Sequence, residues 1–296
     1  STFKTVTASI AVEGGASLTR EYPYVRAIPL PQTDGQLLRN FGDEVCGGTL
    51  ELSFIRSCNT TYGQVGFDLG NSFATGIRRF GVAAAPPPSG GTSGIDPAIA
   101  RSTGPAPGTF RRNQAGFMQD AIGQHDVAVT PLAMALVAES VATGGTMLEP
   151  RFVACVKDPT ERVIARPAPS VYHRAMTPEV ASVLTGFMRG VVEDPRGTGT
   201  AARIPGVAVA GKTGTAETAP GLGPHAWFIA FAPADAPRYA IAVLIEHGGG
   251  EDAPNGATGG RVAAPVARDI LAGLLADPPP SPPCGADRRS APGSGK

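Results

Sequence analysis

The chain has 296 residues, 42% of them hydrophobic, which is enough to bury a sizeable core in one large domain or in two ordinary ones. Its 25 Lys and Arg residues balance its 25 Asp and Glu residues, and it has no long basic run of the kind that nucleic-acid binding requires. No apolar run approaches the roughly 20 residues that span a bilayer, and no basic, apolar leader opens the chain, so we expect this chain to be soluble.

Helices are expected in the first part of the chain. Residues 1–13 carry apolar side chains at helical spacing and are followed by two glycines, so they predict a helix that begins at the first residue. Residues 49–62 have the same spacing, but the polar cluster 57–61 interrupts it. We expect a helix end, or the junction of two short helices, at that cluster.

The middle of the chain contains stretches rich in residues that break helices and strands, and two segments that predict helices. The Pro/Gly/Ser-rich stretches 85–94 and 102–108 predict a long surface excursion, because their composition is poorly suited to a packed core. Two later segments begin with Thr-Pro, in which the threonine caps a helix and the proline takes its first position. The helices predicted from these starts span residues 130–143 and 177–192.

In the last third of the chain, the spacing of the apolar residues changes from one typical of helices to one typical of strands. Short apolar runs rich in Val, Ile and aromatic residues, each bounded by Pro, Gly or Asp, predict three neighbouring strands over residues 207–213, 225–232 and 238–246. A helix is expected over residues 262–275, and the Pro-rich tail 278–296 is expected to be disordered.

The metal-binding residue types are scattered. The four histidines are isolated and the four cysteines have no C-x-x-C spacing, so the sequence predicts neither a metal site nor a cofactor. One or two disulfides in an oxidising compartment fit the sequence about as well as unpaired buried thiols do. The cysteines are Cys46, Cys58, Cys155 and Cys284.

The stretch GVAVAGKTG contains two incompatible motifs. Residues 206–213 spell G-x-x-x-x-G-K-T, the pattern of a phosphate-binding loop, whereas Lys212-Thr213-Gly214 spell the K-T-G motif of serine acyl-transfer enzymes. A phosphate-binding loop needs small residues in its middle and a helix directly after its lysine. Here the middle is Val-Ala-Val-Ala, which is typical of a strand, and the Gly- and Pro-containing residues that follow do not favour a helix. The acyl-transfer interpretation is therefore favoured.

Two further motifs accompany this lysine. Ser1 and Lys4 are three residues apart, a helical spacing that stacks an amine beside a hydroxyl and suits a nucleophile that needs an adjacent base. Only four of the 25 basic residues are lysines, which, unlike arginine, can lose a proton when desolvated. Ser57-Cys58-Asn59 is the only S-x-N in the chain. Each motif alone could be a helix cap, a turn or a strand end, but these explanations account poorly for all three in one order.

With these motifs, the chain resembles the transpeptidase domain of penicillin-binding proteins, which share their fold with serine β-lactamases. Its connecting stretches IGQHDVAVTPLAMALVAESVATGG and HAWFIAFAPADAPRYAIAVLIE are similar to those of the monofunctional, class B members, and its composition is similar to that of the actinobacterial subgroup. The resemblance covers residues 1–277, followed by the tail 278–296. It implies an α/β (α+β) fold in which helices flank an antiparallel sheet.

The same resemblance implies a function. The serine would attack the bond between the two terminal D-alanines of a peptidoglycan stem peptide, D-alanine would leave, and the amine of a neighbouring stem would take the acyl group. β-Lactam antibiotics would acylate the same serine. Family members carry strands, a further module and a membrane anchor before this serine, so we expect a fragment that lacks the first strands of its sheet. Its parent would lie at the extracytoplasmic face of the membrane, with wall-synthesis partners bound through the N-terminal region.

The resemblance also assigns roles to the motif residues. Ser1 would be the nucleophile and Lys4 its base, with a pKa lowered by burial and by Lys212. Ser57 would pass a proton to the leaving amine, and the Asn59 amide would hold the peptide group of the substrate.

The third motif would bind the substrate's terminal carboxylate through Lys212, Thr213 and Thr215, and Gly214 would let the strand approach the substrate backbone. The backbone amides of Ser1 and Thr215 would form the oxyanion hole. If Ser1 is a true terminus, its nitrogen is an amine instead of an amide, and we expect such a fragment to acylate poorly.

Two alternatives stay open. A serine β-lactamase would need a base that drives water onto the acyl-enzyme, and Glu139 and Glu193, in or at the end of helices, are expected to be solvated instead. Cys58 stands where many β-lactamases carry aspartate, which favours a penicillin-binding protein. The other alternative is a non-catalytic domain that binds β-lactams or muropeptides as a sensor or scaffold.

Overall fold

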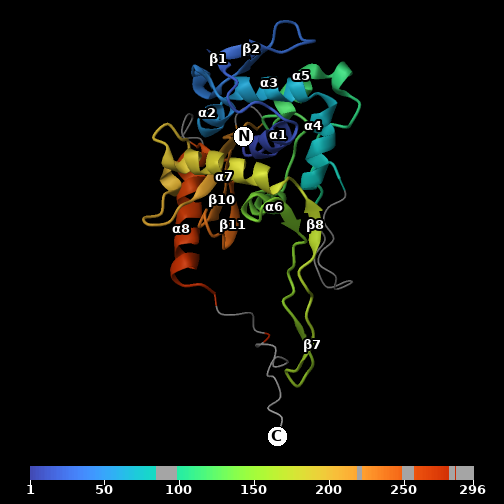
Figure 1. Ribbon diagram of the computed structural model, residues 1–296, viewed down its shortest axis with the longest axis vertical. Coiled ribbons are helices and arrows are strands. Elements are labelled where there is room, and N and C mark those ends of the chain that lie inside the picture. Colours follow the sequence, from blue (N-terminus) through green and yellow to red (C-terminus); the bar gives the residue numbers. More distant parts are fainter. Residues whose placement is uncertain (85–98, 219–221, 249–256, 280–283, 285–296) are drawn as a thin grey trace.

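The computed structural model describes residues 1–84, 99–218, 222–248, 257–279 and 284 (Figure 1). The predicted excursion over residues 85–94, and nearly all of the tail after residue 279, lie outside these ranges. None of the helices in the described residues combines the length and the apolar character needed to cross a bilayer.

The helices and strands alternate irregularly along the chain. The helices are α1 Lys4–Glu13, α2 Leu50–Ile55, α3 Asn59–Leu69, α4 Asn71–Gly76, α5 Gln114–Asp120, α6 Pro131–Ala142, α7 Pro178–Glu193 and α8 Ala264–Ala276, which follows a π-helical turn, Gly259–Ala263. The strands are β1 Tyr22–Val25, β2 Ala27–Pro29, β3 Leu37–Arg39, β4 Cys46–Gly48, β5 Thr146–Leu148, β6 Val156–Lys157, β7 Val163–Ala165, β8 Val171–Arg174, β9 Ala210–Ala216, β10 His225–Ala232 and β11 Tyr239–Ile245.

Strands β9, β10 and β11 form an antiparallel sheet in the order β11-β10-β9. Successive side chains of β10 point to opposite faces, and both faces are apolar. Trp227, Ile229 and Phe231 join the core that α1, α6 and α7 share, whereas Phe228 and Ala230 pack with α8 on the other face. The sheet is therefore buried between helices (Figure 1), which confirms the predicted α/β fold with an antiparallel sheet flanked by helices.

Helix α1 is buried on all sides. Every residue from Lys4 to Ala11 is inaccessible to solvent or nearly so, including the polar side chains of this stretch. The helix begins at Lys4 and not, as predicted, at the first residue, because residues 1–3 form a turn in which the Lys4 N–H donates to the Ser1 carbonyl at 3.1 Å. Ser1 thus lies just before the helix, one turn away from Lys4.

The capped helices are confirmed. Thr130 Oγ1 accepts a hydrogen bond from the Ala133 N–H at 3.1 Å, and Thr177 Oγ1 accepts one from the Val180 N–H at 3.4 Å. The two short helices α2 and α3 meet at the polar cluster 57–61, as predicted, with residues 56–58 between them and residues 59–61 in the first turn of α3.

Other predicted boundaries shift. β9 begins three residues later than the predicted strand 207–213, because Val207 instead forms an isolated bridge with Ile204. The stretch 102–108 is not wholly a surface excursion, since Ser102 is buried and pairs with Val82. The strands β1 to β8 were not predicted, because elements of two to four residues are too short to show an alternating pattern.

The cysteines form two disulfides, Cys46–Cys58 with a Cα separation of 5.5 Å and Cys155–Cys284 with one of 6.0 Å. The first joins β4 to the residue before α3. The second holds Cys284, which is described and buried, against the segment before β6. Of the two alternatives for the cysteines, the disulfides are therefore the observed one.

Gly259 should be essential for the packing of the π-helical turn against the sheet. A Cβ atom at this position would collide with the carbonyl oxygens of Trp227 and Gly214, so we expect Gly259→Ala to destabilise the fold by roughly 1–3 kcal/mol. Gly273, inside α8 with open space around its Cα, is the matched control, and Gly273→Ala should stabilise by up to about 1 kcal/mol. Urea unfolding of both variants tests this, and equal effects of the two substitutions would contradict it.

Candidate active site

Lys4 lies at the centre of the predicted motif residues. Its Nζ atom is 3.0 Å from Ser1 Oγ, 2.7 Å from the Ser57 carbonyl oxygen, 3.2 Å from Ser57 Oγ and 2.7 Å from Asn59 Oδ1. The side chain has no solvent exposure. Residues that are more than 50 positions apart in the sequence therefore surround one amine.

These contacts suit a neutral amine. The Ser57 carbonyl and Asn59 Oδ1 can only accept hydrogen bonds, and they make the two shortest contacts to Lys4. An ammonium donates its third hydrogen to Ser1 Oγ at 3.0 Å, whereas a neutral amine uses its two N–H groups on these two acceptors and keeps its lone pair for the Ser1 hydroxyl. When Lys4 is neutral, it is therefore placed to accept a proton from Ser1.

A second buried lysine approaches from the sheet. Lys212 on β9 donates to Ser57 Oγ at 2.8 Å and to the Thr213 carbonyl at 3.0 Å, and its Nζ lies 5.5 Å from the centre of the Phe54 ring. Ser57 Oγ therefore lies between the two lysine amines, 3.2 Å from Lys4 and 2.8 Å from Lys212. A hydroxyl in this position can relay a proton between them.

Burial dominates the electrostatics of both amines. Desolvation lowers the pKa of Lys4 well below its ordinary value, and the neighbouring charge of Lys212 lowers it further. Desolvation also lowers the pKa of Lys212 to about 7. Two ammonium groups that share one hydroxyl in a dry site repel each other, so the pair favours a state in which at least one amine is neutral.

The K-T-G motif lies on β9, an edge strand of the described sheet. Thr213 Oγ1 is 2.6 Å from Thr198 Oγ1, so these two hydroxyls share a hydrogen. A Cβ atom on Gly214 would come within 3.0–3.1 Å of Thr2 and of Trp227 Cβ. The glycine thus lets the strand approach the turn that carries Ser1, a constraint that the sequence did not reveal.

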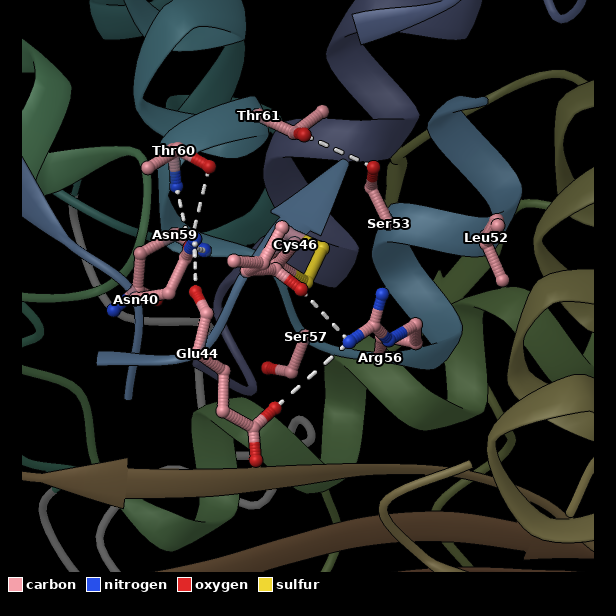
Figure 2. The surroundings of a disulfide bond; sticks show 12 residues. Asn40, Glu44, Cys46, Leu52, Ser53, Arg56, Ser57, Asn59, Thr60 and Thr61 are labelled. Carbon is pink, nitrogen blue, oxygen red and sulfur yellow. Dashed lines mark hydrogen bonds and ion pairs between the residues drawn. A yellow bond between two sulfur atoms is a disulfide. The ribbon is translucent and has the colours of Figure 1, made fainter. Parts of the chain in front are cut away.

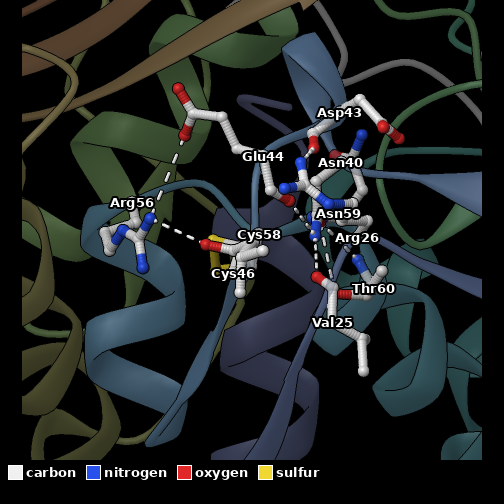
Figure 3. Close-up of polar contacts among 11 residues, drawn as sticks. Val25, Arg26, Asn40, Asp43, Glu44, Cys46, Arg56, Cys58, Asn59 and Thr60 are labelled. Atoms are coloured by element: carbon white, nitrogen blue, oxygen red, sulfur yellow. Dashed lines mark hydrogen bonds and ion pairs between the residues drawn. A yellow bond between two sulfur atoms is a disulfide. The ribbon is translucent and has the colours of Figure 1, made fainter.

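Asn40 holds the S-x-N segment from outside the motif (Figure 3). Its Oδ1 accepts hydrogen bonds from the Asn59 N–H at 2.8 Å and the Thr60 N–H at 3.0 Å, and its amide nitrogen donates to the Val25 carbonyl at 2.8 Å. The residue at the N-cap position of α3, Cys58, makes no side-chain cap because it is in a disulfide. Asn40 therefore caps the helix in its place, and sequence reasoning missed it because it lies about 20 residues away.

The disulfide and an ion pair border the same segment. Figure 2 shows Ser57 beside the Cys46–Cys58 disulfide, with Arg56 next to it. Arg56 donates to the Val45 carbonyl at 3.0 Å and lies 3.9 Å from Glu44. Covalent and polar contacts thus fix both flanks of Ser57.

Two cavities meet at Ser1 and Ser57. The larger has a volume of about 580 Å³ and is lined by Ser1, Ser57 and Asn59, by the β3–β4 connection, by Gln124 and His125, and by Thr215 and Glu217. The smaller, of about 220 Å³, is lined by Ser1 and Ser57 together with Arg56, Thr198, Thr213 to Thr215 and the turn at Gly259. Every residue predicted to act in the site, except the fully buried Lys4 and Lys212, lines one or both cavities.

The two glutamates considered as possible bases lie elsewhere. Glu193 is exposed and pairs with Arg189 on its own helix, as expected. The expectation that Glu139 is solvated was wrong, because it is partly buried and accepts a hydrogen bond from the Leu148 N–H at 3.2 Å, and burial raises its pKa. Neither residue lines a cavity at Ser1.

In the described part of the chain, one His/carboxylate group has its ligand atoms within 4.8 Å of one another, namely Asp120, His125 and Asp126. Hydrogen bonds and charge contacts within the group account for its geometry, because His125 Nδ1 lies 3.3 Å from Asp120 Oδ1 and 3.5 Å from Asp126 Oδ2. We assign no metal to it.

Comparison with known proteins places this arrangement in a family. Residues 1–272 match the model of the penicillin binding protein transpeptidase domain. The chain is 38% identical over 288 residues to the peptidoglycan D,D-transpeptidase PbpA of Mycobacterium tuberculosis, an alignment that covers 94% of this chain and 55% of PbpA. The chain belongs to the penicillin-binding protein transpeptidase family.

Solved structures agree with the sequence comparison. The crystal structure of PBPA from M. tuberculosis superimposes with a TM-score of 0.81 at 37% identity, covering 93% of this chain and 60% of that one. A penicillin G acyl-enzyme complex of the same protein gives a TM-score of 0.79 at 36% identity, with coverages of 93% and 60%. The chain spans about half the length of the curated relatives that it matches, 55% of PbpA from M. tuberculosis and 54% of PbpA from Mycolicibacterium smegmatis.

Asn40 should stabilise the fold through its bonds to α3. Asn40→Ala leaves two N–H groups without their acceptor, and we expect a loss of roughly 1–3 kcal/mol in unfolding free energy. Asn40→Asp keeps an acceptor oxygen and should lose less. Asn71→Ala, which removes an exposed acceptor from the Gly108 and Phe110 N–H groups, is the control, and the prediction is wrong if Asn40→Ala is no more destabilising than this substitution.

Lys212 should make stability depend on pH. Its pKa is about 7 in the fold and near 10.5 when exposed, so between these values the unfolded chain binds more protons and unfolding free energy rises with pH. From pH 7 to 8.5 this contribution amounts to about 2 kcal/mol, and Lys212→Met should remove it. Lys157→Met, in an exposed ion pair, should leave the pH profile parallel to that of the wild type. Denaturant titrations at several pH values provide the measurement, and an unchanged profile in Lys212→Met would refute the assignment.

Proposed function

We propose that this chain is the catalytic domain of a peptidoglycan D,D-transpeptidase, which cross-links stem peptides through an acyl-enzyme on Ser1 and is acylated by β-lactams. The observation that carries the proposal is the 3.0 Å contact between Ser1 Oγ and a buried Lys4 whose two shortest hydrogen bonds go to oxygens that can only accept. Membership of the family and similarity to a structure solved as a penicillin G acyl-enzyme support it.

The first half-reaction follows from the contacts. Neutral Lys4 takes the Ser1 hydroxyl proton as Oγ attacks the carbonyl between the two terminal D-alanines. The developing oxyanion is stabilised by the backbone amides of Ser1 and Thr215. Ser57, between the two lysines, passes a proton to the nitrogen of the leaving D-alanine. Each of these groups acts without a metal or cofactor in this scheme.

The remaining motif residues bind the substrate. Lys212, Thr213 and Thr215 hold the terminal carboxylate, with Thr198 as an added partner of Thr213. Asn59 holds a peptide group of the substrate while its Oδ1 keeps Lys4 in place. Because β9 is an edge strand of the described sheet, a peptide in extended conformation can bind alongside it, with Gly214 allowing close approach.

The cellular location of the protein is also a proposal, based on its family and on its disulfides. Relatives in this family are wall-synthesis enzymes, and two disulfides in the described residues fit an oxidising, extracytoplasmic compartment. We propose that the parent protein acts at the outer face of the cytoplasmic membrane and meets its wall-synthesis partners through regions outside this chain.

Acylation by penicillin tests the proposed nucleophile and base. Intact-mass spectrometry of the full-length protein should show one covalent adduct, which Ser1→Ala should abolish. Lys4→Met should slow acylation by roughly 10²–10⁴-fold, because the hydroxyl loses its base. Ser140→Ala, which removes a buried hydroxyl on α6, is the control and should label at the wild-type rate. An adduct that persists in Ser1→Ala would refute the assignment.

The alternatives give different results in the same assay. A serine β-lactamase would hydrolyse nitrocefin many times per second, whereas slow release of the adduct is expected here because neither Glu139 nor Glu193 lines a cavity at Ser1. A non-catalytic scaffold would keep its role in cells when Ser1 is replaced by alanine. Loss of cross-linking in that variant supports the transpeptidase.

A further inference from the structure

His125 lies on the wall of the larger cavity, which Ser1 also lines. It belongs to the connection between α5 and α6, and its φ of 59° is in the left-handed region that few non-glycine residues adopt. Two residues earlier, Gly123 packs directly against the start of the chain, since a Cβ atom there would lie 2.8 Å from Phe3 Cβ and 3.5 Å from the Ser1 nitrogen. The connection that carries His125 is therefore in contact with the turn that carries the nucleophile.

A buried carboxylate orients the imidazole. His125 Nδ1 lies 3.3 Å from Asp120 Oδ1, an oxygen that also accepts the Asp126 N–H at 2.8 Å. Asp120 has no solvent exposure, whereas about one third of the His125 side chain is exposed. Burial raises the pKa of Asp120 to about 6, so at neutral pH it is mainly ionised and accepts a hydrogen from Nδ1. This contact selects the tautomer in which Nε2 carries the lone pair.

The second half of a transpeptidation needs such a group. The acyl acceptor is an amine that is mostly protonated at neutral pH and cannot attack until it loses a proton. Lys4, which lies 3.0 Å from Ser1 Oγ, serves the return of one proton to that oxygen, so the removal of the other proton calls for a second base. The cavity of about 580 Å³ offers room for a second peptide, and His125 is a base on its wall.

We propose that His125, oriented by Asp120, is the base that deprotonates the incoming acceptor ammonium in this cavity. The proposal rests on the transpeptidase function proposed above. The acceptor ammonium carries three hydrogens and the product amide keeps one. One proton goes to His125 Nε2 and then to water. The other goes through neutral Lys4 to Ser1 Oγ as the amine nitrogen bonds to the acyl carbon and the ester C–O bond breaks.

Other charges act on this histidine and on the acceptor. Asp126 lies 3.5 Å from Nδ1, on the connection itself, and Asp120 approaches from the end of α5. Across the cavity, Arg39 and Asp43 come from β3 and the turn after it, and Glu217 follows β9. These four carboxylates outnumber the one arginine, which pairs with Asp43 at 2.9 Å, and they favour a cationic acceptor over an anionic one.

The test separates acylation from aminolysis in the full-length protein. Asparagine tolerates the left-handed backbone of this position, so His125→Asn is the first variant, Asp120→Asn the second, and His173→Asn, an exposed histidine on β8, the control. Penicillin acylation should stay within about twofold of wild type in all three, which also reports correct folding. With an N-acyl-D-alanyl thioester as donor and D-alanine as the acceptor probe, aminolysis at pH 7 should fall by roughly 10²-fold in His125→Asn.

The pH profile distinguishes a base from a structural residue. The defect of His125→Asn should shrink above the pKa of the acceptor amine, because the amine then arrives neutral, and Asp120→Asn should show a smaller defect of the same form. The proposal is overturned if His125→Asn catalyses aminolysis at the wild-type rate, or if its loss is equal at every pH. It is also overturned if EDTA abolishes aminolysis by the wild-type protein. If wild type itself is not acylated by penicillin, the proposed function fails and not only this inference.

Discussion

The site depends on one interaction, the placement of a neutral amine between a hydroxyl and two obligate hydrogen-bond acceptors. Lys4 would keep its proton in water, where an ammonium is well solvated. Inside the layer formed by α1, α3 and α7 it has no solvent exposure, and Lys212 stands beyond the same serine hydroxyl. Burial therefore favours the neutral form of Lys4, and the free energy that this burial costs must come from the apolar cores on both sides of the sheet.

This explains why α1 is buried on every side. An amphipathic helix would expose one face, and a lysine would extend from that face into water. Because α1 is surrounded, Lys4 can reach only the groups that α3 and the S-x-N segment bring to it. Those groups are fixed by contacts that carry no chemistry of their own: the Asn40 side chain caps α3, the Cys46–Cys58 disulfide holds the residue between Ser57 and Asn59, and Gly214 brings β9 against the turn at Ser1.

The motif residues that the structure brings together were easier to predict from the sequence than the residues that hold them in place. Ser1, Lys4, Ser57 and Lys212 were proposed because three motifs, each weak alone, occur together in one order, and the structure brings these four residues together. The capped helices and the strands of the main sheet were predictable because their patterns are local. Asn40, Thr198 and the disulfide pairs were not, because each acts on a partner far along the chain and an asparagine or threonine in a loop has many ordinary explanations. The helix start at Lys4 and the partial burial of Glu139 likewise depend on tertiary contacts.

The two cavities at Ser1 differ in the groups that line them. The smaller one contains the hydroxyls of β9, Thr198 and the Gly259 turn, groups that suit the terminal carboxylate of a donor peptide, while the larger one is bordered by Asp43, Glu217 and the His125 connection. The larger cavity has the carboxylates of Asp43 and Glu217 against the single guanidinium of Arg39, whereas in the smaller one Glu44 balances Arg56. Under the proposed transpeptidase function, this excess of one negative charge favours the acceptor ammonium in the larger cavity and leaves the hydroxyls of the smaller cavity for the donor carboxylate.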